Sequence, residues 1–211
     1  MKKLSLKTNA VATALVIVQM GCSLFGKRID IKAEYIKAQQ LEQRGGFMKR
    51  ADERDSAFKC YNTSIAIYRE LLSTIDSITD TTYNSHLAQI YNKLGLFDSM
   101  KLDARIAYFI ESLRLAKIAK LYSLRLADEQ NISNCYFYLG QDKSQGSPEQ
   151  KTLFDKATKY MLSSCMEIDS ADDKTELAIE TYDRAHTLFE NIGDTVRRMK
   201  YLHKYTELKY R

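Results

Sequence analysis

The stretch Tyr91-Asn92-Lys93-Leu94-Gly95-Leu96-Phe97 contains the pattern that decides the fold. An aromatic residue stands four positions before a glycine, and an aliphatic residue stands directly before that glycine. The pattern returns as Tyr136-Phe137-Tyr138-Leu139-Gly140 and Phe189-Glu190-Asn191-Ile192-Gly193, with a fainter copy at Leu41-Glu42-Gln43-Arg44-Gly45. Helices commonly end at a residue in the left-handed region, where glycine has no Cβ penalty, so each copy predicts a helix end and a turn. The chain is therefore expected to fold as stacked helical hairpins.

Composition agrees with an all-helical chain. The 211 residues are 45% hydrophobic, which is enough for one well-buried domain or a short array of repeats. One proline and no tryptophan favour helices over sheets. The formal charge is +5, but Lys2, Lys3 and Lys7 lie in a segment expected to be removed, which leaves 29 basic against 27 acidic residues. Nucleic acid requires clustered basic residues on one face, so no nucleic-acid partner is expected.

The amino terminus has the outline of a bacterial export signal. Lys2, Lys3 and Lys7 are followed by an apolar run at residues 10–20 and then by Gly21-Cys22. The run is too short to cross a bilayer, which takes roughly 20 residues, so residues 1–21 are interpreted as a cleaved signal peptide. Plain secretion and an uncleaved anchor are the alternatives.

A small residue directly before Cys22 resembles the lipobox of bacterial lipoproteins, although Gln19 and Met20 depart from its commonest residues. The resemblance implies that Cys22 is the lipidated first residue of the mature chain and that residues 22–28 are a tether. It also implies a cell-envelope location, with the outer membrane favoured because Ser23 follows the cysteine. Whether the protein faces the periplasm or the cell surface is left open.

The remaining cysteines and histidines show no metal-binding or catalytic spacing. Cys60, Cys135 and Cys165 each fall inside an expected helix, where a buried thiol is the simplest interpretation; a Cys135–Cys165 bridge is left open. His86, His186 and His203 are scattered, and neither a Gly-rich phosphate loop nor a Gly-x-Ser-x-Gly motif occurs. We therefore expect no enzyme activity, no metal and no cofactor.

Apolar spacing predicts about eight helices in residues 29–211. They are expected at residues 29–44, 49–75, 81–94, 97–120, from a bend at 120–123 to 139, 148–168, 174–192 and 195–209. Ser147-Pro148-Glu149-Gln150 is a helix start in which Ser147 caps and Gln150 returns the capping bond. In the last helix, Val196, Met199, Leu202, Tyr205 and Leu208 form one stripe that is expected to cover the end of the stack.

These hairpins resemble the tetratricopeptide repeat, a family of α-solenoids. Ala88 and Ser133 stand seven residues before Gly95 and Gly140, and the following helix offers a small residue and an apolar pair, as in Ala157, Met161 and Ser164-Cys165. The glycine intervals of 50, 45 and 53 residues exceed the family period of about 34. Such long repeats are similar to the sensor portions of membrane-bound bacterial regulators.

The resemblance implies a groove lined by the first helix of each pair. Offsets from each glycine place twelve residues on it: Gln39, Glu42, Gln43, Gln89, Asn92, Lys93, Asn134, Phe137, Tyr138, Thr187, Glu190 and Asn191. Six are amides, which can bind an extended peptide backbone, although ordinary solvated surface would look the same.

The expected function is a membrane-anchored scaffold that binds another envelope protein or a peptide. One alternative is a small-ligand or glycan sensor in which Phe137 and Tyr138 stack on a sugar. The other is the stand-alone sensor remnant of a membrane-bound regulator.

Overall fold

The computed structural model describes residues 30–50, 52–74 and 80–210. Within these ranges the chain forms eight α-helices and no strand, which confirms the all-α fold class. The helices are α2 (Ile31–Arg50), α3 (Arg54–Thr74), α4 (Thr81–Gly95), α5 (Leu102–Ile118), α6 (Tyr122–Gln141), α7 (Pro148–Ala171), α8 (Glu176–Asn191) and α9 (Thr195–Lys209). The expected signal peptide, Cys22 and the tether lie outside the described residues.

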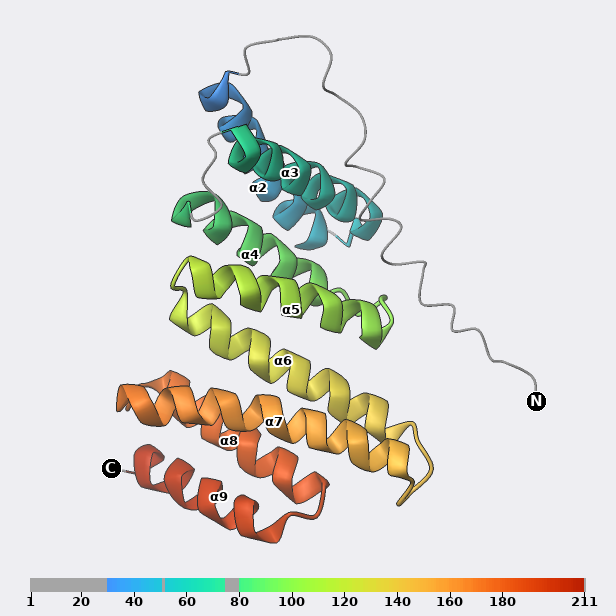
Figure 1. Cartoon of the computed structure of the whole chain (residues 1–211), viewed down its shortest axis with the longest axis vertical. Helices are drawn as coiled ribbons and strands as arrows, with labels where there is room; N and C mark the ends of the chain where they lie inside the picture. The colour runs from blue at the N-terminus through green and yellow to red at the C-terminus, as the bar shows by residue number, and fades with distance from the viewer. Residues whose placement is uncertain (1–29, 51, 75–79, 211) are drawn as a thin grey trace, which may run out of the picture. The chain divides into compact units, whose positions relative to one another are not determined.

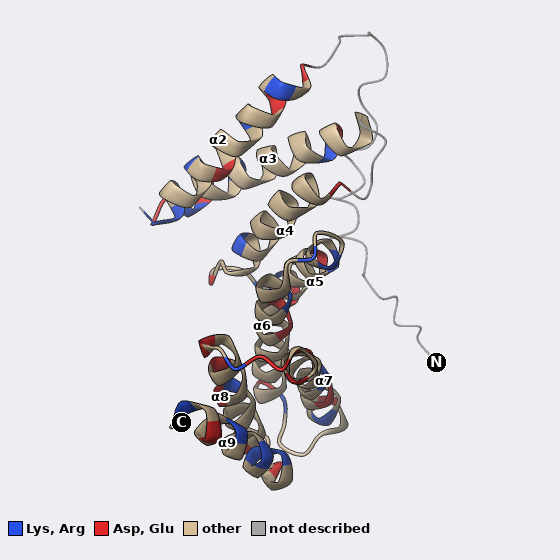
Figure 2. Cartoon of the chain, turned by 90° about the vertical axis from the view of Figure 1, so that its left-hand side faces the viewer, with Lys and Arg blue, Asp and Glu red and all other residues tan. Residues whose placement is uncertain are grey.

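One compact unit comprises residues 32–211. In this unit α4 packs on α5, α6 on α7 and α8 on α9, and each of these pairs also packs on its neighbours in sequence. The hairpins follow one another in chain order in both ribbon views, with α2 and α3 at one end and α8 and α9 at the other (Figures 1 and 2). The hairpins are antiparallel and stacked, as the repeated glycine pattern predicts. In addition α6 contacts α8, so the first helices of these two hairpins meet directly.

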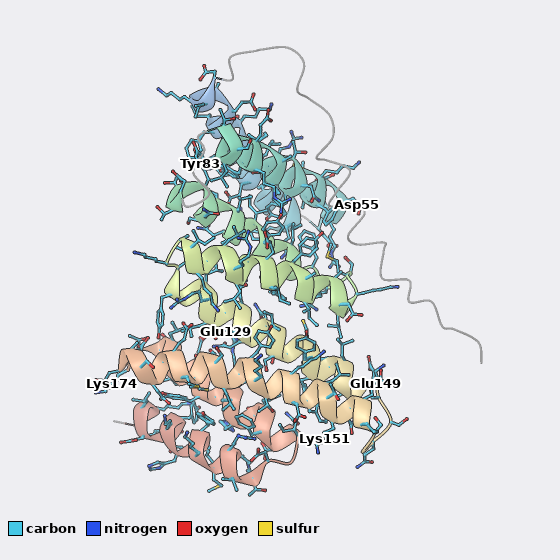
Figure 3. All side chains as sticks on the ribbon, in the orientation of Figure 1. Asp55, Tyr83, Glu129, Glu149, Lys151 and Lys174 are labelled. Atoms are coloured by element: carbon cyan, nitrogen blue, oxygen red, sulfur yellow. The ribbon has the colours of Figure 1, made fainter. Side chains whose placement is uncertain are left out.

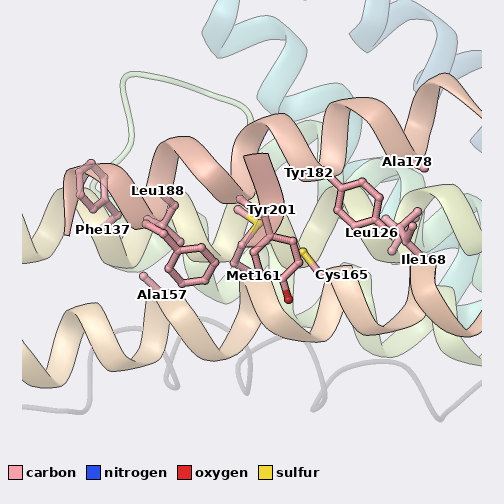
Figure 4. Packing of buried hydrophobic residues seen from close by; sticks show 12 residues of the cluster. Leu126, Phe137, Ala157, Met161, Cys165, Ile168, Ala178, Tyr182, Leu188 and Tyr201 are labelled. Carbon is pink, nitrogen blue, oxygen red and sulfur yellow. The ribbon is translucent and has the colours of Figure 1, made fainter. Parts of the chain in front are cut away.

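The core of the C-terminal half lies between α6, α7, α8 and α9 (Figure 4). The ring of Tyr201 stacks against Tyr182 and Phe189, with ring centroids 6.0 and 5.6 Å apart. Below these rings, Met161 and Cys165 of α7 are fully buried. Burial removes apolar area from water at about 25 cal/mol per Å², so this aromatic cluster accounts for much of the attachment of α9.

One expected helix end is wrong, and at two others the helix ends where expected but its glycine is not left-handed. We predicted that the first helix ends at Gly45-Gly46, but α2 continues through both to Arg50, and Asp52 takes the left-handed conformation instead, with φ 61°. Gly95 and Gly140 are likewise helical, each at or next to the end of its helix. Only Gly193 behaves as expected, with φ +80°. The physical reason for the other three glycines is packing, because aromatic rings of the next helix press on them.

The distances make this packing explicit. A Cβ added to Gly45 would lie 2.8 Å from the Tyr61 ring, and one added to Gly95 would lie 2.6 Å from Phe109. The same construction at Gly140 meets Phe154 at 2.6 Å. In the first three hairpins a ring of the second helix therefore sits where a side chain on the first helix would be. Glycine is required for this close approach and not for a turn.

Several helix starts also differ from the prediction. The second helix begins at Arg54 and not near Lys49, because α2 is longer than expected. The fourth begins at Leu102 and not at Phe97, since Phe97 is a buried turn residue whose ring meets Tyr61 edge-on at 6.3 Å. The bend at 120–123 is confirmed: Lys120 has φ 57°, and α6 starts at Tyr122.

The capping prediction at α7 holds in part. The Ser147 hydroxyl oxygen accepts a hydrogen bond from the backbone amide of Gln150, as expected. The Gln150 side chain does not return a bond to Ser147. Its Oε1 accepts from the Gly146 amide at 2.8 Å, and its Nε2 donates to the Gly140 carbonyl at 3.3 Å. Gln150 thus ties the start of α7 to the end of α6.

The expected stripe along the last helix is wrong for Val196 and Met199 and is confirmed for Tyr205 and Leu208, which pack against the core. Val196 and Met199 are 83% and 56% exposed, and Tyr201 is the one fully buried residue of α9. The side of α9 that meets the stack carries Tyr201 with Tyr205 and Leu208 around it. The inward side is centred on Tyr201, which the expected stripe left out, because its ring stacks on Tyr182 and Phe189.

Candidate functional site

A serine hydroxyl joins the two helices of each of the first three hairpins. Ser64 donates to the Ala38 carbonyl, Ser112 to that of Ala88 and Ser133 to that of Ala157, each at 2.8 Å and each buried. In the first two hairpins the serine is on the second helix, and in the third it is on the first. Residues Ala38, Ala88 and Ser133 all stand seven positions before the pattern glycine. The small residue in the sequence pattern therefore marks the closest approach within a hairpin.

Polar side chains then join the first helices of successive hairpins. Between α2 and α4, Glu42 accepts from Lys93 Nζ at 2.7 Å and lies 2.9 Å from His86 Nδ1. Burial by itself raises the pKa of Glu42, but the hydrogen bonds with His86 and Lys93 outweigh it and hold this pKa below its usual range. The carboxylate is therefore charged at neutral pH and pairs two helices of different hairpins.

His86 continues this contact into an aromatic cluster. Its Nε2 lies 3.2 Å from the Tyr35 hydroxyl, which also accepts a hydrogen bond from Gln39. The Tyr68 ring stacks on the imidazole with centroids 5.0 Å apart. A hydroxyl, an imidazole and a carboxylate that are hydrogen-bonded one after the other can relay a proton. The Lys93 ammonium on the same carboxylate also makes the group a charged bridge between α2 and α4.

Between α4 and α6 the bridge is built from neutral groups around one buried acid. Asn92 donates to Asp128 Oδ1 at 2.8 Å, and Ser112 of α5 lies 2.6 Å from Asp128 Oδ2. Asp128 is completely buried. Burial raises its pKa to about 7, against the lowering effect of the hydrogen bonds with Ser112 and Asn92.

The next two residues of α6 are also buried and polar, and they contact other helices. Gln130 donates to Thr181 of α8 at 2.9 Å and to Ser164 of α7 at 3.2 Å. Glu129 accepts from Ser163 at 2.8 Å and lies on α6 between α5 and α7 (Figure 3). Burial raises the pKa of Glu129 as well. Three consecutive side chains of α6 therefore point to three different parts of the stack.

The twelve groove residues predicted from the sequence divide into three groups. Glu42 and Phe137 are buried in the contacts between helices. Gln39, Gln89, Asn92, Lys93 and Asn134 are half-buried, and all but Asn134 bond to side chains of this chain. Gln43, Tyr138, Thr187, Glu190 and Asn191 are exposed, and Glu190 pairs with Arg198 at 3.0 Å. The structure brings Glu42 and Lys93 together with Gln39 nearby, and it does not place all twelve on one open surface.

The buried position of Phe137 removes it from the sugar-stacking alternative. Its ring stacks on Phe154 at 5.7 Å within the core of the third hairpin. Tyr138, which is 54% exposed, would have to hold a sugar alone. No other observation on the described residues favours a glycan over a peptide.

Sequence reasoning missed Tyr35, His86, Asp128 and Gln130 as members of these contacts. Asp128-Glu129-Gln130 interrupts the apolar spacing of its helix, and three adjacent polar residues look like solvated surface in a sequence. Their position in the sequence could have indicated a buried contact. Gln130 and Asn134 stand three residues before and one residue after Ser133, which the glycine pattern already places at a close helix contact.

Two of the hollows on the described surface each contain an ion pair between lining residues. One, of about 160 Å³, lies between α7, α8 and α9, where Asp169 accepts from Tyr182 and pairs with Lys204. The other lies between α6 and α7, where Arg125 pairs with Glu167 at 2.9 Å. In the part of the chain that the structure describes, no group of three or more His, Cys, Asp or Glu residues is arranged to hold a metal.

The three thiols among the described residues are unpaired. Cys60 is half-buried, Cys135 and Cys165 are buried, and all three are free, so the Cys135–Cys165 bridge left open by the sequence does not form. Burial raises the pKa of Cys165 to about 12. Burial also raises the pKa of Cys135, so Cys135 and Cys165 are parts of the packing and lack the lowered pKa of a reactive thiol.

The fold and these contacts define a class of protein, an all-α stack of antiparallel hairpins whose first helices are joined by buried polar side chains. The chain matches no model of a known protein family and no curated protein. Over residues 30–50, 52–74 and 80–210, no helix has both the length and the apolar character that a membrane crossing requires.

Proposed function

We propose that this chain is a binding scaffold of the bacterial cell envelope that holds an extended segment of another protein along its first helices. The observation that carries the proposal is the set of polar bridges from α2 to α4, α4 to α6 and α6 to α8. Bridges of this kind fix the register of successive hairpins, so side chains between them are held at fixed spacing. A preorganised surface loses little conformational entropy when it binds a flexible chain.

Four residues at one offset are the proposed contact positions. Gln43, Lys93, Tyr138 and Asn191 each stand two positions before a pattern glycine, one on each first helix. Gln43, Tyr138 and Asn191 are exposed, while Lys93 is half-buried and ion-paired. Amides can donate to and accept from a peptide backbone, and a tyrosine adds a large contact area at low entropic cost. The proposal includes no catalytic step, cofactor or nucleic acid.

The test is crosslinking in intact cells followed by capture from membranes. The variant Gln43→Ala, Tyr138→Ala, Asn191→Ala changes three exposed residues of first helices. A matched control, Ile110→Ala with Met166→Ala, changes two exposed residues of second helices. We expect the first variant to lose most of its specific crosslinked partner and the control to keep it. Equal recovery of the same partner by both variants would contradict binding along the first helices.

We further propose that a lipid on Cys22 anchors this scaffold to a membrane, most simply the outer membrane. The support is the basic start, the short apolar run and Gly21-Cys22 in the sequence. One acyl chain gives only marginal binding, so a stable anchor requires more than one chain, as lipoproteins carry.

A further inference from the structure

A buried line of three oxygen atoms joins the second and third hairpins. Ser112 Oγ lies 2.8 Å from the Ala88 carbonyl and 2.6 Å from Asp128 Oδ2, and all three residues are completely buried. A serine hydroxyl carries one hydrogen, which cannot be donated to both oxygens at once. The neighbouring hairpins indicate where it goes, because Ser64 and Ser133 donate to alanine carbonyls in the same role.

The short contact between Ser112 and Asp128 then requires a second hydrogen. If Ser112 donates to Ala88, the hydrogen between Ser112 Oγ and Asp128 Oδ2 must belong to a protonated Asp128 carboxyl. In that state Asn92 donates to Oδ1, Asp128 donates to Ser112, and Ser112 donates to Ala88. In the ionised state Ser112 turns to Asp128, the bond to Ala88 is lost, and a negative charge remains buried. A buried charge without a cation is costly, so the two states differ in stability.

The groups around Asp128 favour the protonated state. From α4 it faces the Asn92 amide and from α5 the Ser112 hydroxyl, neither of which is charged. On α6 itself the nearest titratable group is Glu129, whose negative charge adds to the effect of burial in raising the pKa of Asp128 to about 7. Among the described residues, no lysine, arginine or histidine forms an ion pair with Asp128.

We propose that Asp128 is a proton-operated lock, in which its protonated carboxyl closes the contact of α6 with α4 and α5 and its ionisation loosens that contact. Asn92, one of the residues predicted to line the partner-binding groove, is a member of the lock. The effect of the lock on partner binding rests on the proposed function, whereas the existence of the lock does not.

The direction of the pH effect follows from proton binding in the two states. Asp128 has an ordinary pKa near 3.8 when unfolded and holds its proton to about pH 7 when folded. Between these values the folded state binds more protons, so stability falls as pH rises. Opening of this contact becomes up to about tenfold more favourable for each pH unit in this window, and the effect ends above pH 7.

The direct test is the titration of the Asp128 carboxyl carbon by NMR in the full-length protein without a partner. We expect a midpoint in the neutral range. A midpoint below about pH 5 would overturn the proposal. This measurement requires no variant and therefore stands even if a substitution prevents folding.

A second test uses variants and amide hydrogen exchange in α4, α5 and α6. In Asp128→Asn the amide can donate to Ser112 while its oxygen accepts from Asn92, which reproduces the protonated arrangement without a titrating group. At pH 7 we expect exchange in α6 to be at least tenfold slower in Asp128→Asn than in the natural protein, and the difference should shrink as the pH falls towards 4. The control Glu129→Gln removes the neighbouring acid and should keep the transition. A transition that persists in Asp128→Asn, or that disappears only in Glu129→Gln, would overturn the assignment to Asp128.

These outcomes are separate from the proposed function. Loss of the lock with intact partner capture would leave the scaffold proposal in place. A carboxyl that titrates near neutrality without any captured partner would leave the lock in place. If both hold, partner capture should weaken between pH 6 and pH 8 in the natural protein and stay constant in Asp128→Asn.

Discussion

At the scale of single residues, three of the pattern glycines matter because they have no side chain where an aromatic ring packs, and less because they can adopt a left-handed conformation. Gly45, Gly95 and Gly140 are helical and receive the rings of Tyr61, Phe109 and Phe154. The sequence pattern located these positions correctly and gave the wrong physical reason for three of them. A glycine near the end of an apolar helix has the same signature whether it turns the chain or admits a ring. Only contact with the next helix distinguishes the two roles.

Two adjacent glycines in α2 provide a matched test of this reason. In Gly45→Ala the new methyl would lie 2.8 Å from the buried Tyr61 ring, so overpacking should reduce the free energy of unfolding by roughly 1–3 kcal/mol. In Gly46→Ala the nearest atom is the Tyr61 hydroxyl at 3.7 Å, and better helix propensity should stabilise the protein by up to about 1 kcal/mol. Urea unfolding followed by circular dichroism measures both. Equal effects of the two substitutions would refute the packing explanation.

At the scale of elements, the helices were predictable where turn chemistry was local. Asp80 caps α4 and Ser147 caps α7, as aspartate and serine commonly do, and the bend before α6 occurs within the expected range of residues 120–123. The errors occur where a distant element decides the outcome. Phe97 is held in a turn by the rings of Phe58 and Tyr61, and the inward side of α9 is set by Tyr182 and Phe189.

The inward side of α9 gives a prediction at this scale. Tyr201→Ala removes a ring that is 2% exposed and stacked on two others, so the free energy of unfolding should fall by roughly 3–5 kcal/mol. Val196→Ala, on the stripe that the sequence suggested was inward, should change it by less than about 0.5 kcal/mol because Val196 is 83% exposed. Thermal and urea unfolding of both variants would check the assignment. A large loss of unfolding free energy in Val196→Ala would instead support the inward stripe that the sequence predicted.

At the scale of the whole molecule, the sequence predicted the class of fold and part of the site. The repeated pattern predicted the stack of hairpins and singled out Glu42, Asn92 and Lys93 as residues of a partner-binding groove. It could not tell that these polar groups bind other parts of the same chain. Asp128 and Gln130 stayed hidden because a polar residue inside an apolar helix carries no mark of its partner, which lies 36 or 51 residues away.

Attachment to a membrane is the prediction that concerns the chain as a whole. If Cys22 carries a lipid, the natural protein should enter the detergent-rich phase on phase separation, and Cys22→Ala should remain in the aqueous phase. Cys60→Ala is the control, since Cys60 lies in α3 and should not affect partitioning. Identical partitioning of the natural protein and Cys22→Ala would refute a lipid at this residue.

The three adjacent polar residues of α6 make its neighbours non-interchangeable. Asp128 needs the amide and hydroxyl of the hairpin before it, and Gln130 needs the hydroxyls of its own hairpin and the one after it. Solenoids held together by apolar contact alone can be lengthened by copying a unit. Here a duplicated or transposed hairpin would set a carboxyl or an amide against a surface with no complementary group. The order of the hairpins between α4 and α8 is therefore constrained by these buried polar contacts.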